Sequence, residues 1–511
     1  MAIRDQTNEK IKELNRLEEL LDEHRNGRVV AQCHGVFDLL HVGHIDHLEE
    51  ASQRSDLLVV TITPDEYVNK GPHRPAFDEQ RRAEALAALD CVDYVAVNKW
   101  PSAEDTIRKL KPDYYVKGPD YEDPEDDPTG KIEEETSAVE EVGGEILITQ
   151  DTKHSSSGLI NRHLSILPEE SKQFLADFRQ RYSTDDIIKY LEGCRDLDVL
   201  VVGEAIIDEY VYVSSLGQSS KAPMLSVKQG EMEKQTGGIL AVANHVSNFA
   251  GHVEMVAMVG EHDTQEEFIR KNLSNDVEPT FFYRPDSPTI VKRRYIDEYF
   301  FNKLFGVYEI NDHQLPDGAT DELCELLEDR ITEPDMVITV DFGHHMLEKK
   351  TRDKLSSDSS YLALNAQTNS GNRGYHTITK YESADFPCLA HSELHMDNRR
   401  RHGDNQKLLK KTANELSAQR AVVTEGKDGC LGFEQPNYYE QVPAFAGDVV
   451  DRIGAGDAFL SISSMVSYQE APLDIVGFVG NAVGAQAVST VGNRDSVEYV
   501  PLIKQIEALM K

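Results

Sequence analysis

Short apolar runs alternate with stretches of helical apolar spacing between residues 28 and 165, and this alternation restricts the fold more than any other feature. Apolar runs bounded by turn residues predict strands, and apolar residues three or four apart predict helices. Strands separated by helices favour an α/β fold with a parallel sheet. The expected strands are 28–33, 57–63, 92–97, 113–117 and 145–149, and the expected helices are 44–54, 78–88, 102–110 and 131–142.

A histidine-rich turn follows the first expected strand. It runs from Cys33 to His44 and places His41 and His44 three residues apart at the start of a helix. Free backbone N–H groups and the helix dipole attract anions at such a helix start. Imidazole N–H groups there can donate to phosphate oxygens and stabilise moving charge. The turn therefore predicts a phosphate site.

Two other interpretations of this turn stay open. The histidines could be satisfied structural side chains. Alternatively, they could bind a metal ion, although the ligand spacings typical of tetrahedral zinc sites are missing. The crowded side chains that such a metal site would draw on are Cys33, His34, His41, His44 and His47.

Three further polar segments follow other expected strands. Lys70-Gly-Pro-His-Arg-Pro75 follows the second strand, Lys117-Gly-Pro-Asp-Tyr121 follows the fourth, and His154-Ser-Ser-Ser-Gly158 follows the fifth. Ligands of parallel α/β sheets bind beyond the carboxyl ends of the strands. We therefore expect these segments to share one edge of the sheet with the histidine-rich turn.

The pattern Gly-x-Phe-Asp-x-x-His-x-Gly-His and the order of the later segments resemble the cytidylyltransferase-like nucleotidylyltransferases. The similarity covers residues 28–165 and is greatest to the corresponding domain of the bifunctional ADP-heptose synthases. The resemblance implies a Rossmann-like domain that joins a sugar 1-phosphate to a nucleoside triphosphate and releases pyrophosphate. It implies catalytic roles for His41, His44 and Lys70, and nucleotide or phosphate contacts for Gly35, Phe37, Arg82, Lys117, Ser155, Ser156 and Ser157. Family members often have threonine in the last motif, where this chain has three serines.

A second strong motif lies near the C-terminus, where Val450-Asp-Arg-Ile-Gly454-Ala-Gly-Asp457 precedes an apolar helical run. Glycines at a helix start expose consecutive backbone N–H groups, which can stabilise the charge of a phosphoryl group in transfer. Asp457 can take the proton from an attacking hydroxyl. A plain helix N-terminus with an acidic first turn is the alternative interpretation.

This motif, with Gly237-Gly238, Gly260-x-x-Asp263 and Thr424-x-Gly426-x-x-Gly429, resembles the ribokinase-like (PfkB) carbohydrate kinases over residues 197–511. The resemblance implies ATP and magnesium as donor, Asp457 as catalytic base and a small β lid near 210–227 and 288–310. It implies an anion hole at Gly454, Ala455 and Gly456, nucleotide contacts at Thr424, Gly426, Gly429 and Asn481, sugar contacts at Asp208, Gly237 and Gly238, and an indirect metal role for Glu393.

The chain departs from the kinase pattern at four positions. Ala241 and Ala390 replace asparagines, Asp341-Phe-Gly-His-His345 replaces Asp-Tyr-x-Lys-Gly, and Arg452 replaces a small residue. The two domains also stand in the reverse of the usual order of the ADP-heptose synthases. These differences leave open which sugar is used and whether the kinase half turns over.

The chain is strongly acidic, with 53 basic and 90 acidic residues among 511 and a net charge of −37. Nucleic acid and anionic membranes are therefore unexpected partners. Six cysteines without metal or disulfide spacing are typical of a reducing cytoplasm. No apolar run reaches membrane-spanning length, and the charged N-terminus lacks a signal sequence. We expect a cytoplasmic location.

Four segments are expected along the chain: a single amphipathic helix over 1–27, a nucleotidylyltransferase domain over 28–165, a helical linker over 166–196 and a kinase domain over 197–511. The combined expectation is a homodimeric enzyme that phosphorylates a sugar or sugar phosphate and then activates it with ATP or CTP. A nucleotidylyltransferase with a silent kinase half and a nucleotide-binding scaffold are the alternatives.

Overall fold

The computed structural model describes residues 9–38, 40–68, 75, 77–118, 131–149, 167–219, 221–299, 301–447 and 449–511, without the side chains of 131–133. The chain forms two compact units: the first comprises residues 1–166 with 503–509 and 511, and the second comprises residues 167–502 with 510. No helix in the described ranges is long and apolar enough to span a bilayer.

The first unit contains the expected five-stranded parallel sheet, in the order β3-β2-β1-β4-β5. Its strands are β1 Val30–Gly35, β2 Leu57–Ile62, β3 Tyr94–Val97, β4 Tyr114–Lys117 and β5 Glu145–Ile148. Its helices are α3 Val42–Gln53, η1 Asp65–Tyr67, α4 Glu79–Ala87, α5 Glu104–Leu110 and α6 Lys131–Glu141. The α/β prediction is confirmed here, and each expected strand and helix is present within two residues of its predicted start.

The strand order reverses direction at β1, because β2 and β3 lie on one side of it and β4 and β5 on the other. The residues of β2 and the first four residues of β1 are buried because helices cover the sheet. Val60 and Leu48 of α3 pack in one core cluster. Such a reversal leaves a crevice at the carboxyl ends of the central strands. The histidine-rich turn leaves β1 at this place.

The expected single helix over residues 1–27 is wrong in its extent. Ile11 forms an isolated parallel bridge with Val95 of β3, and the helix α2 begins only at Leu14 and runs to His24. The backbone N–H of Lys12 donates to Val95 O at 2.9 Å, so residues 11–13 are extended beside the sheet. The apolar spacing was correct for the remainder, since Leu14, Leu17 and Leu21 are buried.

Residues 167–196 form the expected helical connector, with α8 Glu169–Arg181, α9 Thr184–Gly193 and η4 Cys194–Asp196. Ser183 and Asp186 make reciprocal capping bonds at the start of α9. The ring of Phe178 stacks on Phe478 at 4.6 Å. The connector is therefore packed onto the second unit.

The second unit is built on a twelve-stranded sheet whose main path is β11-β10-β6-β12-β13-β14-β15-β16-β17, with β7 and β8 on β6 and β9 on β8. The strands are β6 Asp198–Gln218, β7 Leu225–Gly238, β8 His252–His262, β9 Val277–Pro288, β10 Ile290–Asp297, β11 Lys303–Glu309, β12 Met336–Asp341, β13 Leu362–Ala366, β14 Phe386–Ala390, β15 Arg420–Thr424, β16 Cys430–Glu434 and β17 Tyr438–Val442.

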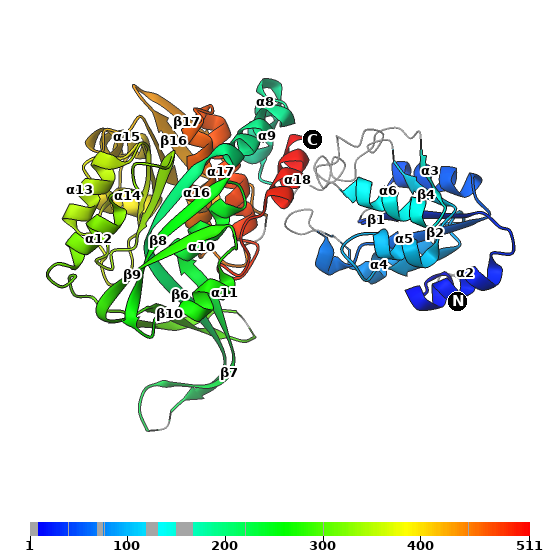
Figure 1. Ribbon diagram of the computed structural model, residues 1–511, viewed down its shortest axis with the longest axis horizontal. Helices are drawn as coiled ribbons and strands as arrows, with labels where there is room; N and C mark the ends of the chain where they lie inside the picture. The colour runs from blue at the N-terminus through cyan, green and yellow to red at the C-terminus, as the bar shows by residue number, and fades with distance from the viewer. Residues whose placement is uncertain are drawn as a thin grey trace. The chain divides into compact units, whose positions relative to one another are not determined.

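Strand β6 belongs to two layers because it is 21 residues long. Its first half pairs in parallel with β8 and β12 in the body of the unit. Its second half pairs with β7 and β10, which with β11 form the expected β lid. Figure 1 shows the β6–β7 hairpin projecting away from the body.

Helices cover the body sheet. Helix α16 lies against β12, β13 and β14, and α17 lies against β16 and β17. The helices are α10 Ile239–Ser247, α11 Glu266–Asn272, α12 Ala319–Leu327, α13 Lys349–Asp358, η5 Ile378–Lys380, α14 His391–Asp397, α15 Asn405–Glu415, η6 Gly426–Asp428, α16 Ala455–Tyr468, α17 Leu473–Ala487 and α18 Tyr499–Met510. In Figure 1, α12, α13 and α15 lie at the outer side of this unit.

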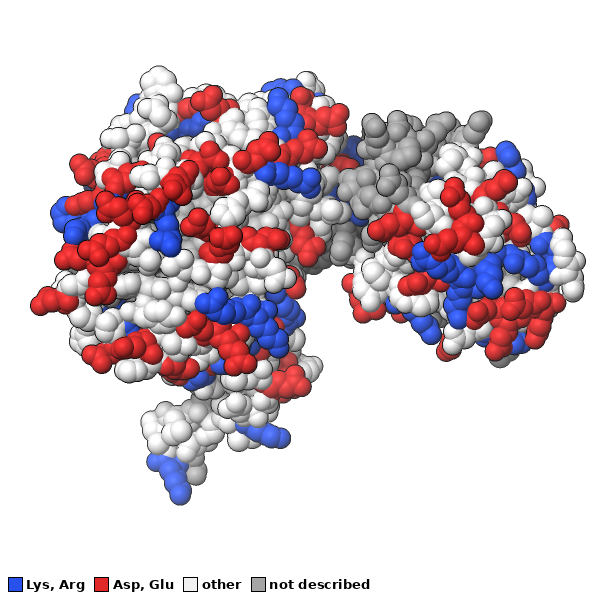
Figure 2. All heavy atoms as spheres, viewed as in Figure 1, with Lys and Arg blue, Asp and Glu red and all other residues white. Residues whose placement is uncertain are grey.

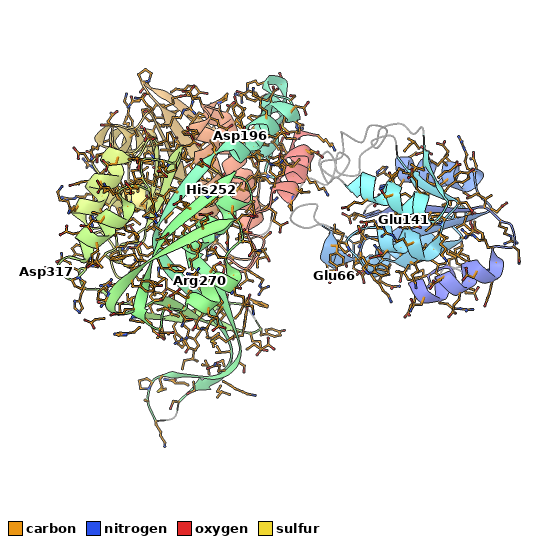
Figure 3. The ribbon with its side chains drawn as sticks, viewed as in Figure 1. Glu66, Glu141, Asp196, His252, Arg270 and Asp317 are labelled. Atoms are coloured by element: carbon orange, nitrogen blue, oxygen red, sulfur yellow. The ribbon has the colours of Figure 1, made fainter. Side chains whose placement is uncertain are left out.

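The parallel strands β6, β8 and β12 of the body point their carboxyl ends toward the lid, whereas β16 runs the opposite way. Asp196 and His252 mark the amino ends of β6 and β8, and Arg270 of α11 lies nearer the lid in Figure 3. Acidic side chains are spread over the visible surface of this unit (Figure 2), as the net charge of −37 requires.

Candidate active sites

The first unit brings His41 and His44 together at the start of α3. His41 has extended backbone angles (φ −137°) and is the N-cap residue, so helix α3 begins directly after it. The two imidazole rings stack with their centroids 4.0 Å apart, and the Phe37 ring packs edge-on against His44 at 5.3 Å. Phe37 is 7% exposed and has a positive φ of 48°. This packing fixes both imidazoles beside the free N–H groups of the first helical turn.

His34 has a different role from the other two histidines. Its Nδ1 lies 3.0 Å from Thr61 Oγ1, and its Nε2 lies 3.3 Å from Thr63 Oγ1. Among the residues that the structure describes, metal-ligating atoms converge only at the exposed group Glu261, His262 and Asp286. The metal interpretation of the histidine-rich turn therefore has no support from the geometry.

The Arg82 side chain binds backbone carbonyl groups and a carboxylate of this unit. Its side chain is completely buried, and its guanidinium donates to Phe77 O, Val36 O and Thr63 O and pairs with Asp65. This differs from the predicted phosphate contact, because the guanidinium has no exposed face to offer a ligand. Arg82 instead positions the segment after β1, which leads into the histidine-rich turn.

Lys117 ends β4, next to the turn. Its ammonium pairs with Glu135 of α6 at 2.5 Å, and only 10% of its side chain is exposed. His47 Nδ1 lies 2.8 Å from Thr149 Oγ1, which joins α3 to the end of β5. Burial lowers the pKa of His47 to about 4, so this imidazole is neutral near pH 7.

Of the remaining predicted residues of this unit, the structure describes Gly35 but not the lysine and serine segments. A Cβ on Gly35 would meet the Phe37 ring at 3.2 Å, so a side chain there would press on the ring that supports His44. Lys70, Ser155, Ser156 and Ser157 lie outside the described residues.

In the second unit, the predicted anion hole lies at the N-terminus of α16. Gly454 is the N-cap with a φ of +84°, and a Cβ there would lie 1.8 Å from Asn493 Oδ1. Only glycine fits this position. A Cβ on Gly456 would meet nothing within 4 Å, so the space beside the first turn is open. The N–H groups of Ala455, Gly456 and Asp457 therefore face an accessible place.

Asp457 is buried in the first turn of α16, 7% exposed. Burial, together with the negative charges of Asp208 and Glu393, raises the pKa of its carboxyl to about 7, although Lys292 acts in the opposite direction. A carboxylate with a pKa near the working pH is suited to general-base catalysis. Asp457 therefore has the electrostatics of a base as well as the position.

Asp208 lies on β6 where the strand enters the lid. It is 4% exposed, and its carboxylate accepts a hydrogen bond from Arg294 of β10. A Cβ on Gly237 would lie 2.3 Å from Asp208 Oδ2, so only glycine leaves room for this carboxylate. Gly238 follows with φ +59° and begins α10. The predicted sugar-binding residues thus share one place at the base of the lid.

An open polar cavity of about 350 Å³ lies beside this place. Its lining includes Gln235, Thr236, Ala241 and Asn493, and Asn493 N donates to Gln235 Oε1 at 2.8 Å. The side chain of Asn493 is also the one that approaches Gly454. The cavity therefore borders the anion hole, and the small side chain of Ala241 forms part of its wall.

The predicted nucleotide residues gather around the end of β15. Thr424 ends the strand, Gly426 has φ +61°, and Gly429 has φ +91° with Val442 O 2.0 Å from where a Cβ would be. Asn481 of α17 is buried and donates to Val442 O at 3.0 Å. Its amide thus fastens the helix to β17, which is a structural contact.

Glu393 lies in the first turn of α14. Its two carboxylate oxygens accept the backbone N–H groups of Ala390 at 2.8 Å and Thr368 at 3.0 Å. The carboxylate is 8% exposed at residue level, and burial raises its pKa. The carboxylate thus caps the first turn of α14 and holds residue 368 beside it; its metal role stays a prediction.

Two buried charged residues in this part of the second unit, Glu204 and Lys292, were not predicted. Glu204 of β6 accepts the N–H groups of Phe342 at 3.0 Å and His344 at 3.1 Å. Burial, reinforced by Asp341, raises the pKa of Glu204 to about 7. Lys292 of β10 is the second residue. Its strand carries three consecutive cations, Lys292, Arg293 and Arg294, so the sequence does not show which of them faces the site.

Comparison with known protein families gives one match in the N-terminal part of the chain and one in the C-terminal part. Residues 33–189 match the Cytidylyltransferase-like model, and residues 374–499 match the pfkB family carbohydrate kinase model. The chain joins a cytidylyltransferase-like domain to a pfkB-type carbohydrate kinase domain. Both fold predictions are confirmed.

Curated relatives of this chain are named as bifunctional proteins. The protein named Bifunctional protein HldE of Syntrophotalea carbinolica is 40% identical over 145 residues, which is 28% of each chain. That of Geobacter metallireducens is 38% identical over 165 residues, 32% of each chain. The chain thus matches about a third of these relatives' length.

A solved structure supports the fold of the second unit. Phosphofructokinase-2 from Escherichia coli, in complex with substrates and products, superposes with a TM-score of 0.50 at 16% identity. The match covers 62% of this chain and all of that one. At this identity the likeness concerns the fold alone.

Proposed function

We propose that the chain is a bifunctional enzyme of nucleotide-activated sugar synthesis. The kinase domain phosphorylates a sugar or sugar phosphate at its anomeric hydroxyl. The nucleotidylyltransferase domain then transfers a nucleotidyl group to that phosphate and releases pyrophosphate. The observation that carries the proposal is the buried Asp457, with its raised pKa, in the first turn beside an open glycine-rich helix start.

In the kinase step, Asp208 would bind an acceptor hydroxyl and Asp457 would take the proton of the attacking hydroxyl. The acceptor oxygen forms a bond to the γ-phosphorus while the bond from that phosphorus to the nucleoside diphosphate breaks. The N–H groups of residues 455–457 would stabilise the charge on the phosphoryl oxygens. Magnesium enters as part of the nucleotide substrate and neutralises phosphate charge.

In the nucleotidyl step, the sugar phosphate oxygen attacks the α-phosphorus and pyrophosphate leaves. His41 and His44 would donate to the triphosphate oxygens from the start of α3. Their stacked rings, fixed by Phe37, hold these donors before substrate arrives. Either ATP or CTP is compatible with this arrangement, and Lys70 and Ser155–Ser157 are proposed as further phosphate contacts.

We propose a homodimer formed through the lid. All seven residues of β11 are exposed, among them Phe305 and Tyr308. Leu216 and Leu225 at the tip of the β6–β7 hairpin are also exposed. An exposed apolar face of this kind is typical of an interface.

We also propose a cytoplasmic location. The six cysteines are free thiols, which is typical of proteins in a reducing compartment.

A second function is favoured by one specific observation. Ala241 and Ala390 remove two polar side chains from the kinase half. A nucleotidylyltransferase with a silent kinase half, acting on an alcohol phosphate other than a sugar phosphate, would tolerate both changes. A nucleotide-binding scaffold without turnover is the third alternative. It would not need Asp457, His41 and His44, and their presence in the chain argues against it.

A substrate screen tests these functions. The full chain is incubated with ATP or CTP and a panel of sugars, sugar phosphates and sugar 1-phosphates, and ADP and pyrophosphate are measured separately. The proposal expects ADP with one acceptor class and pyrophosphate with a 1-phosphate. Pyrophosphate without ADP supports the second function, and neither product across the panel contradicts both enzymatic proposals. Asp457→Asn and His44→Ala are the controls, each expected to remove one product.

A further inference from the structure

Lys292 lies on the face of β10 that carries the kinase site. Side chains alternate between the two faces of a strand, so Lys292 and Arg294 lie on one face of β10 and Arg293 lies on the opposite face. Arg294 pairs with Asp208, whereas Arg293 pairs with Glu209. Lys292 is opposite Asp208 in the parallel register of β10 and β6. It is 7% exposed.

The ammonium of Lys292 differs from the other cations of β10 and β11. Arg293, Arg294 and Lys303 each form an ion pair with a carboxylate. Within the ranges that the structure describes, the Lys292 ammonium makes no hydrogen bond or ion pair, although the backbone carbonyl of Lys292 accepts from Arg294 at 3.3 Å. Its nearest aromatic partner is the Phe342 ring, with a distance of 5.2 Å from Nζ to the ring centroid.

A buried ammonium without a close counter-ion destabilises the folded chain. Burial of a charge without a close counter-ion costs several kcal/mol in general. Burial is the largest effect on Lys292 and lowers its pKa, and the carboxylates of Asp208, Glu204 and Asp457 oppose it. These carboxylates come from β6 and α16, so the cation faces the same space as the proposed base. A cation held there without a protein partner is prepared for an anionic ligand.

We propose that Lys292 is a catalytic cation of the kinase domain, whose ammonium binds an oxygen of the γ-phosphoryl group during its transfer to the acceptor. This inference rests on the proposed kinase function. Negative charge spreads over the three phosphoryl oxygens in the transition state, so a fixed cation nearby stabilises it. Lys292 stays protonated throughout, because the acceptor proton goes to Asp457 and the departing oxygen remains on the nucleoside diphosphate.

The test uses a probe that needs no acceptor. Isothermal titration calorimetry measures ADP binding to the full chain with magnesium, alone and with aluminium fluoride, which mimics a phosphoryl group in transfer. The variant Lys292→Met keeps the length of the side chain and removes its charge. Arg293→Gln, on the opposite face of the same strand, is the matched control.

The wild type and Arg293→Gln are expected to bind ADP at least tenfold more tightly with aluminium fluoride. Lys292→Met is expected to bind ADP alone as the wild type does and to lose most of that gain. An equal gain in Lys292→Met, or no gain in the wild type that binds ADP, overturns the inference and leaves the proposed function intact. No ADP binding by the wild type contradicts the proposed kinase function itself.

A folding defect is separated from the loss of a contact by a second variant. Lys292→Gln also removes the charge but keeps a polar group among the buried carboxylates. The gain in ADP affinity with aluminium fluoride is compared for whichever of the two variants binds ADP. If neither variant binds ADP while Arg293→Gln does, Lys292 serves folding of the site and the inference is overturned.

Discussion

Asp208 of β6 and Arg294 of β10 form an ion pair in which both side chains are largely buried, with 5% and 14% of each side chain exposed. Arg294 also lies over the Tyr210 ring, 5.7 Å from its centroid. The pair connects the strand that enters the lid from the body with a strand that belongs to the lid alone. The proposed acceptor carboxylate is thus oriented and charge-balanced by the lid before substrate binds.

The variant Arg294→Met tests this relationship. Removing one partner of a buried pair leaves an uncompensated charge, which costs roughly 3–5 kcal/mol. We expect a lower melting temperature of the second unit and a raised KM for the acceptor. The melting temperature is measured by differential scanning calorimetry and KM by ADP release. The double variant Asp208→Asn/Arg294→Met should recover stability but not the acceptor KM; recovery of both would contradict the proposed role of Asp208.

The kinase pH profile follows from Asp457. Its carboxyl has a pKa of about 7 and acts as a base only when ionised, so kcat/KM should rise with pH through about 7 and level off above. The charged groups that act on it are Asp208 of β6, Glu393 of α14 and Lys292 of β10. A profile flat from pH 5 to 9 would contradict the assignment. Asp457→Asn should lower kcat about 10²–10⁴-fold.

The same carboxyl predicts a change in stability. Its pKa in the folded chain, about 7, is above the reference value of 3.8. Folding therefore favours the protonated form, and this contribution to stability is lost as pH rises from about 4 through 7. Asp457→Asn carries no charge, so it should exceed the wild type in stability at pH 8 by a few kcal/mol (about 1.4 per pKa unit) and match it near pH 4. Denaturant unfolding at both pH values measures the difference.

The nucleotidylyltransferase half depends on the stacked imidazoles. His44→Ala removes one donor at the start of α3, and loss of one preorganised donor typically costs 10²–10³-fold in kcat. We expect this loss in pyrophosphate release with ADP release unchanged. His24→Ala, on α2, is the control. Normal pyrophosphate release by His44→Ala would remove this residue from the site.

Arg82 and its neighbour Arg81 form a natural matched pair. Arg82 is buried and donates to three carbonyl groups, whereas the Arg81 side chain is 63% exposed and pairs with Glu84. Arg82→Ala leaves buried acceptors unsatisfied, so it should destabilise the first unit by roughly 3 kcal/mol or more. Arg81→Ala should change stability by less than about 0.5 kcal/mol. A normal melting temperature with a raised KM for the nucleotide would favour a direct phosphate contact for Arg82 instead.

Local sequence was sufficient for the elements and for the glycine positions. Strand and helix periods are local properties, so β1–β5 and α3–α6 were predictable within a few residues. Gly454 was identified from its motif, and its φ of +84° with Asn493 beside it explains why only glycine fits. The break at Ile11 was not predictable, because the partner that draws this residue into a bridge is Val95.

Side-chain partners are properties of the folded chain. The sequence places Arg82 and Lys117 near the turn but does not show that Asp65 and Glu135 neutralise them. Lys292 and Glu204 carried no recognised motif, and their importance arises because distant strands bury them near each other, with Lys292 also near Asp457. The sequence alone determined the two α/β domains and their glycine-lined helix starts, since these depend on local period and backbone freedom. Tertiary structure decided which charges are matched and which face the sites, since burial and charge pairing depend on residues far apart in the chain.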